Sequence, residues 1–165
     1  MDVAIGLPNT VPGTRGDQLV EFARRGEDPP KLLLGGTVDA SFKRAARYGK
    51  DWILGGGTPD QARDGRRKLE EAWREAGREG RPYVGALAYF SLGPEGDKNA
   101  DSYLGHYYAA RGEETARQII ASAATDADTV RSYVDAFGDA GCDELFLFPC
   151  AAAPEQADLL AEAAL

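Results

Sequence analysis

The sequence predicts an α/β fold in which short strands alternate with amphipathic helices around one parallel sheet. Short apolar runs alternate with helical patterns along all 165 residues, and the whole chain reads as a single domain. An internal repeat supports this prediction. The run LLLGGT at residues 32–37 returns as WILGGGT at residues 52–58. Each copy is typical of a strand, a glycine turn and a helix start, the unit that builds parallel sheets and barrels.

The first part of the chain is predicted to form two such units. An apolar run at residues 3–7 predicts a strand, and Asp17 is placed to cap the helix after it. A second strand is expected at residues 31–34, followed by a helix that Thr37 caps and Gly49 ends. The inward face of this second helix is predicted to consist of Val38, Phe42, Ala45 and Ala46.

The third unit has the strongest helix start in the chain. A strand at residues 51–54 is followed by Thr58, Pro59 and Gln61, which supply an N-cap, a proline at the first helical position and a capping box. The buried face of this helix is predicted to consist of Ala62, Leu69, Ala72, Trp73 and Ala76.

Two more strands are expected in the second half, which makes five in all. The nearly continuous apolar run at residues 83–90 suits a strand covered on both faces. A helical region is expected at 101–124, broken near Gly112, and a strand at 144–148 is followed by a last helix that starts at Pro154. Between them, Asp126 is expected to cap a helix whose inward face consists of Val130, Tyr133, Val134 and Phe137.

Composition excludes several functions. The chain has 27 acidic and 19 basic residues, and its net charge of −8 argues against nucleic acid as a partner. No apolar run approaches the roughly 20 residues that span a bilayer, and no secretory signal opens the sequence, so we expect a cytoplasmic protein without membrane contact.

A single histidine excludes a multi-histidine metal site, and no metal is expected. Cys142 and Cys150 flank an expected strand that would hold them about 26 Å apart, so two free thiols are predicted.

The two glycine turns are the candidate binding site. Both follow a strand and open a helix, where glycine backbone and the helix N-terminus favour a bound anion. An ordinary tight turn without a ligand is the alternative reading. Asn9, after the first strand, either contacts a ligand at the same edge or is a turn residue. The candidate binding residues are Asn9, Gly35, Gly36, Thr37, Gly55, Gly56 and Gly57.

His106 is the candidate catalytic residue. It lies in an aromatic stretch at residues 103–108 and could donate a proton or contact a cofactor, although a structural histidine is the favoured reading. The tyrosines of this stretch could line a flat aromatic cofactor or simply pack between helices.

Three stretches resemble luciferase-like monooxygenases, which are flavin- or deazaflavin-dependent (β/α)8 barrels. Residues 31–93 carry the glycine turns and the passages RAARYG and EAWREAGREGRP, residues 128–149 read DTVRSYVDAFGDAGCDELFLFP, and the opening VAIGLPN is similar to the family's first strand. The resemblance implies FMN or a deazaflavin (coenzyme F-420) as the cofactor. It places the phosphate side of the site at the glycine turns.

The chain also departs from the family pattern. A full barrel takes about 250 residues and eight strands, whereas this chain is predicted to have five strands, and strands two to four of the family have no counterpart. A small or incomplete barrel is therefore expected, closed either by rearrangement or by a second copy as a homodimer or domain-swapped dimer. The resemblance implies an oxidoreductase with impaired or lost activity. The alternative is a non-catalytic barrel remnant that acts as a self-associating or regulatory module.

Overall fold

The α/β class is confirmed by a computed structural model that describes residues 33–49 and 51–164. The predicted strand at residues 3–7, the helix capped by Asp17 and the candidate residue Asn9 lie outside the described residues. The described strands form one parallel sheet in the order β1-β2-β3-β4. They are β1 (Leu33–Gly35), β2 (Asp51–Leu54), β3 (Tyr83–Phe90) and β4 (Glu144–Pro149).

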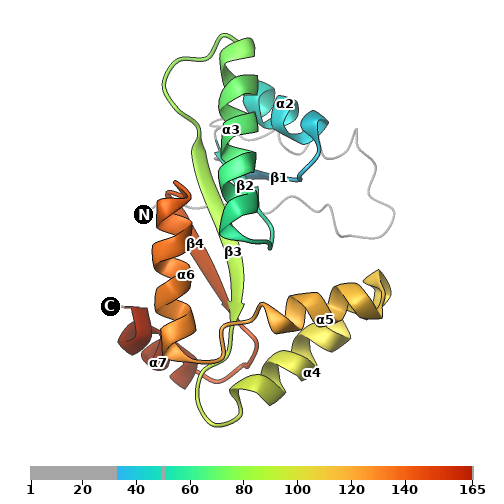
Figure 1. Ribbon diagram of the computed structural model, residues 1–165, viewed down its shortest axis with the longest axis vertical. Coiled ribbons are helices and arrows are strands. Elements are labelled where there is room, and N and C mark those ends of the chain that lie inside the picture. Colours follow the sequence, from blue (N-terminus) through green and yellow to red (C-terminus); the bar gives the residue numbers. More distant parts are fainter. Residues whose placement is uncertain (1–32, 50, 165) are drawn as a thin grey trace, which may run out of the picture.

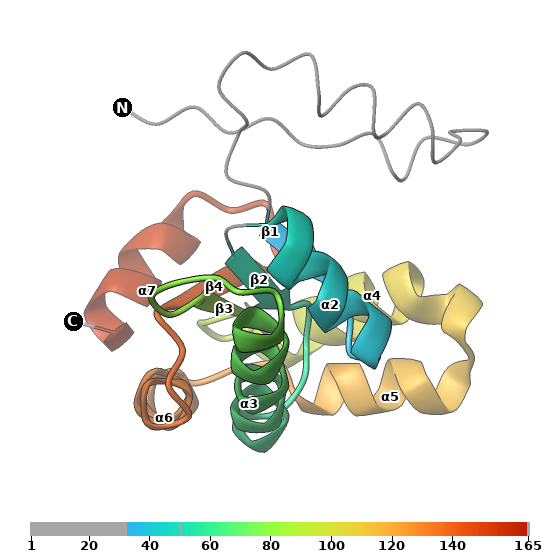
Figure 2. The same cartoon turned by 90° about the horizontal axis from the view of Figure 1, so that it is seen from above.

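The helices form a layer on one face of the sheet and a hairpin at one end. Helices α2, α3 and α6 lie along one face, and α4 and α5 project as a pair beyond the carboxyl end of β3 (Figures 1 and 2). The elements are α2 (Asp39–Tyr48), α3 (Pro59–Glu75), α4 (Gly96–Tyr108), the 3₁₀ helix η1 (Ala109–Arg111), α5 (Glu113–Ala121), α6 (Ala127–Asp139) and α7 (Glu155–Ala164). The predicted break at Gly112 is confirmed, and α4 starts five residues before the predicted position 101.

The core fills the space between the sheet and the helix layer. Strand side chains alternate, so that every second residue points at the helices; Trp52 and Val84 are examples, and both are fully buried. Helix α3 packs closely on β2, because Gly65 faces the Trp52 ring. A Cβ added at Gly65 would lie 2.4 Å from the indole carbon Cη2. The buried cluster also includes Phe42, Leu54, Leu69, Ala86 and Phe137.

The opposite face of the sheet would be the inside of a barrel, and the described residues do not close one. Phe146 and Ile53 flank Gly85 on this face, where a Cβ added at Gly85 would lie 3.0 Å from Phe146 Cε2. Leu33 is 38 % exposed and Phe148 is 47 % exposed. In the described part of the chain, β1 and β4 each pair with one neighbour, so each leaves one edge unpaired.

The start of α2 differs from the prediction. Thr37 was expected to be the N-cap, but the helix begins at Asp39 with Val38 as N-cap and no capping side chain. The shift by one residue turns Val38 outward, leaving it 63 % exposed, and Ser41 takes its place on the buried face. The predicted end at Gly49 is confirmed.

Two predicted core residues are also exposed. Helix α3 ends at Glu75, so Ala76 lies beyond its last turn and faces solvent. Val134 on α6 is 40 % exposed, whereas Val130 and Phe137 on the same helix are buried as predicted. The capping box of α3 is confirmed, because the Thr58 side chain accepts from the Gln61 N–H and the Gln61 side chain accepts from the Thr58 N–H.

Helix α7 is fastened to the segment after β3 by one buried side chain. The Gln156 amide accepts a hydrogen bond from the Leu92 N–H and donates one to the Leu92 carbonyl, each 2.8 Å long. Both backbone groups of Leu92 are thereby satisfied in the interior. This contact holds the carboxyl end of the sheet against the last helix.

Candidate functional site

The candidate site lies at the carboxyl ends of β1, β2 and β3. Gly35 pairs with Ile53 in parallel register, so the two glycine turns leave the same edge of the sheet side by side. The Trp52 indole Nε1 donates a 2.9 Å hydrogen bond to the Gly36 carbonyl and joins β2 to the turn after β1. Six of the eight predicted residues thus share one edge, namely Gly35, Gly36, Thr37, Gly55, Gly56 and Gly57.

The second glycine turn presents bare backbone at the start of a long helix. Gly56 and Gly57 have φ values of +102° and +147°, which side chains rarely adopt. A Cβ added at Gly56 would meet nothing within 4 Å, so its backbone faces open space. The turn leads into the N-terminus of α3, where the helix dipole favours negative charge.

A cavity of about 430 Å³ opens beside this turn, between the carboxyl ends of β2 and β3 and the α5 side of the hairpin. Its volume falls within the range of about 300–1,000 Å³ that is typical of small-molecule sites. Arg111 supplies a cation, and Tyr89, Tyr108 and Leu87 supply apolar and aromatic surface. The remaining lining residues are Gly55, Gly56, Gly57, Thr58, Gln61, Ala88, Thr115, Gln118, Ile119, Ser122 and Tyr133.

A pair of tyrosines forms part of the cavity wall. The hydroxyls of Tyr89 and Tyr108 are 2.9 Å apart and the rings meet edge to face, with centroids 6.2 Å apart. Burial is the main cause that raises the pKa of Tyr89, and the hydrogen bond to Tyr108 adds to it. The Arg111 guanidinium lies 5.7 Å from the centre of the Tyr108 ring. The wall therefore presents a pair of hydrogen-bonded hydroxyls next to the positive charge of Arg111.

Sequence reasoning found the glycines of this cavity and missed its opposite wall. Tyr108 belongs to the aromatic stretch that the sequence offered as a lining for a flat cofactor, so that signal was present. Arg111 lies one residue before the helix break at Gly112, where nothing in the local pattern marks it as a binding residue.

His106 lies apart from the glycine turns. It is exposed on α4 and lines a different hollow of about 360 Å³ with Asn99, Ser102, Tyr103, Tyr107 and Cys150. Both cysteines are free, as predicted. Burial raises the pKa of Cys150 to about 11, so this thiol stays protonated at neutral pH. The structure does not bring His106 to the cavity at the strand ends.

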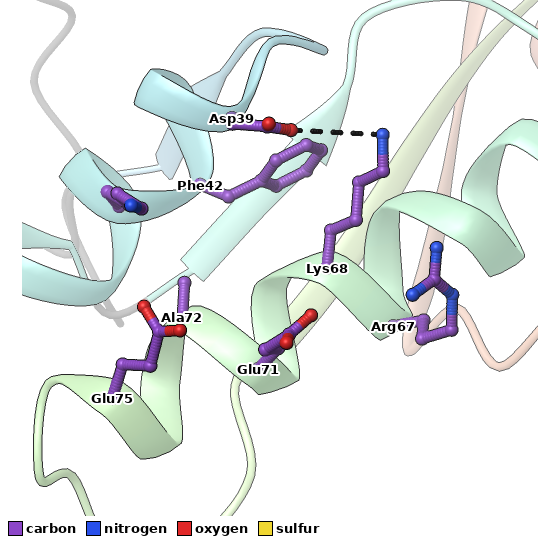
Figure 3. A pocket seen from close by; sticks show the side chains of 8 residues that line it. Asp39, Phe42, Arg67, Lys68, Glu71, Ala72 and Glu75 are labelled. Atoms are coloured by element: carbon purple, nitrogen blue, oxygen red, sulfur yellow. Dashed lines mark ion pairs between the residues drawn. The ribbon is translucent and has the colours of Figure 1, made fainter.

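A third hollow lies on the helix layer between α2 and α3 (Figure 3). It is small, about 230 Å³, and charged side chains surround it. Lys68 lies 3.8 Å from Asp39 and 3.5 Å from Asp64, so its charge is paired within the helix layer. The charged side chains of this groove pair with one another between α2 and α3, which identifies it as helix packing.

Among the described residues, no group of three or more His, Cys, Asp or Glu side chains could hold a metal ion. None of the helices in this part of the chain is both long and apolar enough to cross a membrane.

Comparison with known proteins gives one family and several solved structures. The family model for luciferase-like monooxygenases matches residues 8–162. An F420-dependent secondary alcohol dehydrogenase, solved with an F420-acetone adduct, superposes with a TM-score of 0.66 at 19 % identity, over 83 % of this chain and 48 % of that chain. The comparison with curated proteins found no match.

Two other structures give the same fold at lower scores. The coenzyme F420-dependent tetrahydromethanopterin reductase from Methanopyrus kandleri has a TM-score of 0.56 at 17 % identity, covering 79 % of this chain and 48 % of that chain. The EDTA monooxygenase from Chelativorans sp. BNC1 has a TM-score of 0.56 at 12 % identity, covering 82 % of this chain and 45 % of that chain.

The chain therefore spans about half the length of the solved structures that it matches. At these identities the structures establish the fold, an α/β architecture in which the barrel is not closed by the described residues. The family model covers nearly the whole sequence and confirms the resemblance read from the glycine turns. The chain belongs to the luciferase-like monooxygenase family.

Proposed function

We propose that this chain binds a reduced flavin such as FMN, or a deazaflavin, and acts as an oxidoreductase at the carboxyl edge of its sheet. The observation that carries the proposal is the 430 Å³ cavity, which combines an open glycine turn, the N-terminus of α3 and Arg111. A flavin-type cofactor has an anionic tail and a flat ring, and these features match the two kinds of wall in the cavity.

The residues present fit such a group. The open backbone at Gly55 and Gly56, together with Arg111, would hold the phosphate. Leu87, Tyr89 and Tyr108 would lie against the ring and exclude water from it. The turn at residues 35–37, held by Trp52, leaves the same edge of the sheet but does not line this cavity.

The chemistry itself belongs to the cofactor, because a reduced flavin activates oxygen and a deazaflavin transfers hydride. The protein would hold the cofactor in position and supply hydrogen-bond donors beside it. Burial raises the pKa of Tyr89, and its hydroxyl, paired with that of Tyr108, can donate a hydrogen bond at the cavity wall. His106 as an acid remains part of the proposal, although its hollow is separate.

The comparisons support a flavin-type cofactor for the family. The alcohol dehydrogenase was solved with an F420-acetone adduct, and the reductase is described as coenzyme F420-dependent. The EDTA-acting neighbour is described as a monooxygenase. We therefore propose a flavin-type cofactor for this chain as well. We further propose that its substrate is a small molecule and that the protein is cytoplasmic.

The test is a titration with oxidised FMN, reduced FMN and the deazaflavin, read by calorimetry and thermal shift. We expect micromolar binding of one of them, and loss of that binding in Gly56→Val. Gly77→Val is the matched control, because both glycines have positive φ and open space around the missing Cβ, while Gly77 lies at the far end of α3. Absence of binding by the folded protein at millimolar concentration contradicts the proposal.

A second candidate function is a non-catalytic, self-associating module. The described sheet has two unpaired edges and partly exposed apolar residues on its inner face, which proteins usually cover. Self-association as a homodimer is compatible with either function. Cofactor binding is the measurement that separates the two.

A further inference from the structure

One stripe of helix α4 carries aromatic and polar side chains that neither the hairpin core nor the cofactor cavity uses. Its members are spaced three or four residues apart and so share one face of the helix, namely Asn99, Ser102, Tyr103, His106 and Tyr107. The buried face of the same helix consists of other residues, namely Gly96, Ala100, Leu104 and Tyr108. The stripe lies outside the apolar cluster that joins α4 to α5.

This α4 stripe lines a hollow of about 360 Å³ together with Cys150, which follows β4. The volume falls within the range of about 300–1,000 Å³ that is typical of small-molecule sites, which combine aromatic surface with a few polar groups. The hollow shares no lining residue with the 430 Å³ cavity at the glycine turn. It is therefore a second, separate candidate site.

Two tyrosine rings of the stripe are exposed and already stacked. Tyr103 is 41 % exposed and Tyr107 is 62 % exposed, and their ring centres lie 5.9 Å apart with 19° between the planes. Tyr107 also meets Tyr108 edge to face at 4.9 Å, and Tyr103 meets Tyr89 at 6.3 Å. Because neighbouring rings hold both tyrosines, little side-chain freedom remains to be lost when a flat ligand adds to the stack.

Three polar side chains accompany the rings, those of Asn99, Ser102 and His106. None of the three makes a hydrogen bond within the described part of the chain. An amide, a hydroxyl and an imidazole together offer donors and acceptors. No Asp, Glu, Lys or Arg is among the described residues that line the hollow, so nothing there selects a charged ligand. The hollow suits an uncharged ligand with hydrogen-bonding groups on its edge.

We propose that this hollow binds an uncharged planar aromatic molecule that carries a hydroxyl group, such as a phenol or a naphthol. The face of the ligand would lie against the stacked pair of Tyr103 and Tyr107. Its hydroxyl would form a hydrogen bond with the imidazole of His106, which lies between the two tyrosines along the helix.

The hollow and the cofactor cavity are neighbours across one ring. Tyr89 lines the cavity and meets Tyr108 in the cavity wall, and it also meets Tyr103 of the α4 stripe. An aromatic occupant would therefore be a candidate substrate of the oxidoreductase. That role rests on the proposed function, whereas binding at the hollow requires no cofactor.

The test is a calorimetric titration of the full chain with 2-naphthol, without any cofactor. We expect a dissociation constant of about 100 µM, which is reasonable for a ligand of this size. Decahydro-2-naphthol has the same skeleton and hydroxyl but no flat ring, and it should bind about fivefold more weakly. Absence of 2-naphthol binding at about 2 mM, or equal affinity for the two compounds, overturns the proposal.

Variants locate the bound probe. Tyr107→Leu should weaken 2-naphthol binding about fivefold, whereas Tyr107→Phe keeps the ring and the affinity. Tyr48→Leu is the matched control, because Tyr48 is 61 % exposed but lies at the end of α2 in the helix layer. His106→Ala should weaken binding of 2-naphthol and leave binding of naphthalene, which has no hydroxyl, unchanged. Far-UV circular dichroism verifies that each variant is folded, and an unchanged affinity in Tyr107→Leu overturns the proposal.

Gly56→Val separates this inference from the proposed function. The substitution alters the glycine turn of the cofactor cavity, so the variant should lose the flavin-type cofactor and keep 2-naphthol. Loss of 2-naphthol in this variant would place the probe in the cofactor cavity and overturn the proposal. A failed cofactor titration leaves the naphthol result intact, and absence of naphthol binding leaves the cofactor test intact.

Discussion

The Trp52 indole Nε1 donates a 2.9 Å hydrogen bond to the Gly36 carbonyl, across the boundary between two βα units. The indole is fully buried, and a buried indole N–H needs an acceptor. At Gly36 the φ is +118°, and a Cβ there would lie 2.4 Å from Ser41 Oγ. The shape of the first glycine turn thus depends on a side chain from the next strand.

Trp52→Phe is expected to weaken both the fold and the candidate site. The phenyl ring keeps part of the packing but leaves the Gly36 carbonyl without its donor, which costs about 1–3 kcal/mol. Urea denaturation measures the loss of stability, and the cofactor titration measures the loss of affinity. Trp73→Phe is the control, because the Trp73 indole also donates to a backbone carbonyl, that of Glu79, away from the glycine edge. Equal cofactor affinity in the two variants would contradict the link to the site.

Gly65→Ala is expected to destabilise the protein although alanine is the better helix former. The added Cβ would lie 2.4 Å from Trp52 Cη2, and overpacking of this kind costs about 1–3 kcal/mol. The gain in helix propensity is only about 1 kcal/mol. Gly138→Ala on α6 is the control, since a Cβ there meets nothing within 4 Å and should stabilise the protein. Urea midpoints that rise in both variants would show that Trp52 can move aside.

Local sequence signals located the described elements, and tertiary contacts decided the rest. The strand at residues 83–90 and the capping box at Thr58 were both predicted, because periodicity and capping act within a few residues. The cap at Thr37 was wrong. The helix starts one residue later with Val38 as N-cap, after a turn that Trp52 of the next strand holds through the Gly36 carbonyl, a contact that no local pattern shows.

The candidate site was likewise predictable from the sequence only in part. The glycine turns follow directly from the βα repeat, so the sequence was sufficient to place them on one edge. Arg111 reaches the cavity only because the α4–α5 hairpin packs against Tyr89 at the carboxyl end of β3. That packing joins residues far apart in the chain, and no local pattern encodes it.

Gln156→Leu is expected to cost about 2–4 kcal/mol of stability. The change removes two hydrogen bonds of 2.8 Å and leaves the buried Leu92 N–H and carbonyl unpaired. Gln118→Leu is the control, because its amide bonds only to exposed Glu114 and should change stability by less than about 0.5 kcal/mol. Denaturant unfolding of the two variants provides the comparison. A small effect at Gln156 would mean that water replaces its amide.

Stability is expected to fall as the pH rises above about 9, with Cys150 as one cause. Burial raises the pKa of this thiol in the folded protein to about 11, whereas the unfolded chain ionises near its ordinary value of about 8.5. Because the pKa is higher in the folded protein, the protonated thiol contributes its full share to the stability at pH values below the pKa of the unfolded chain. This contribution is lost as the pH rises through the pKa of the folded protein. Urea midpoints between pH 7 and 10.5 should therefore decline less steeply for Cys150→Ala than for the natural chain. Burial also raises the pKa of Tyr89, which adds the same pH dependence to both proteins, so only the difference between the two slopes reports on the thiol. Identical slopes would show that the thiol ionises equally easily in the folded and unfolded chains.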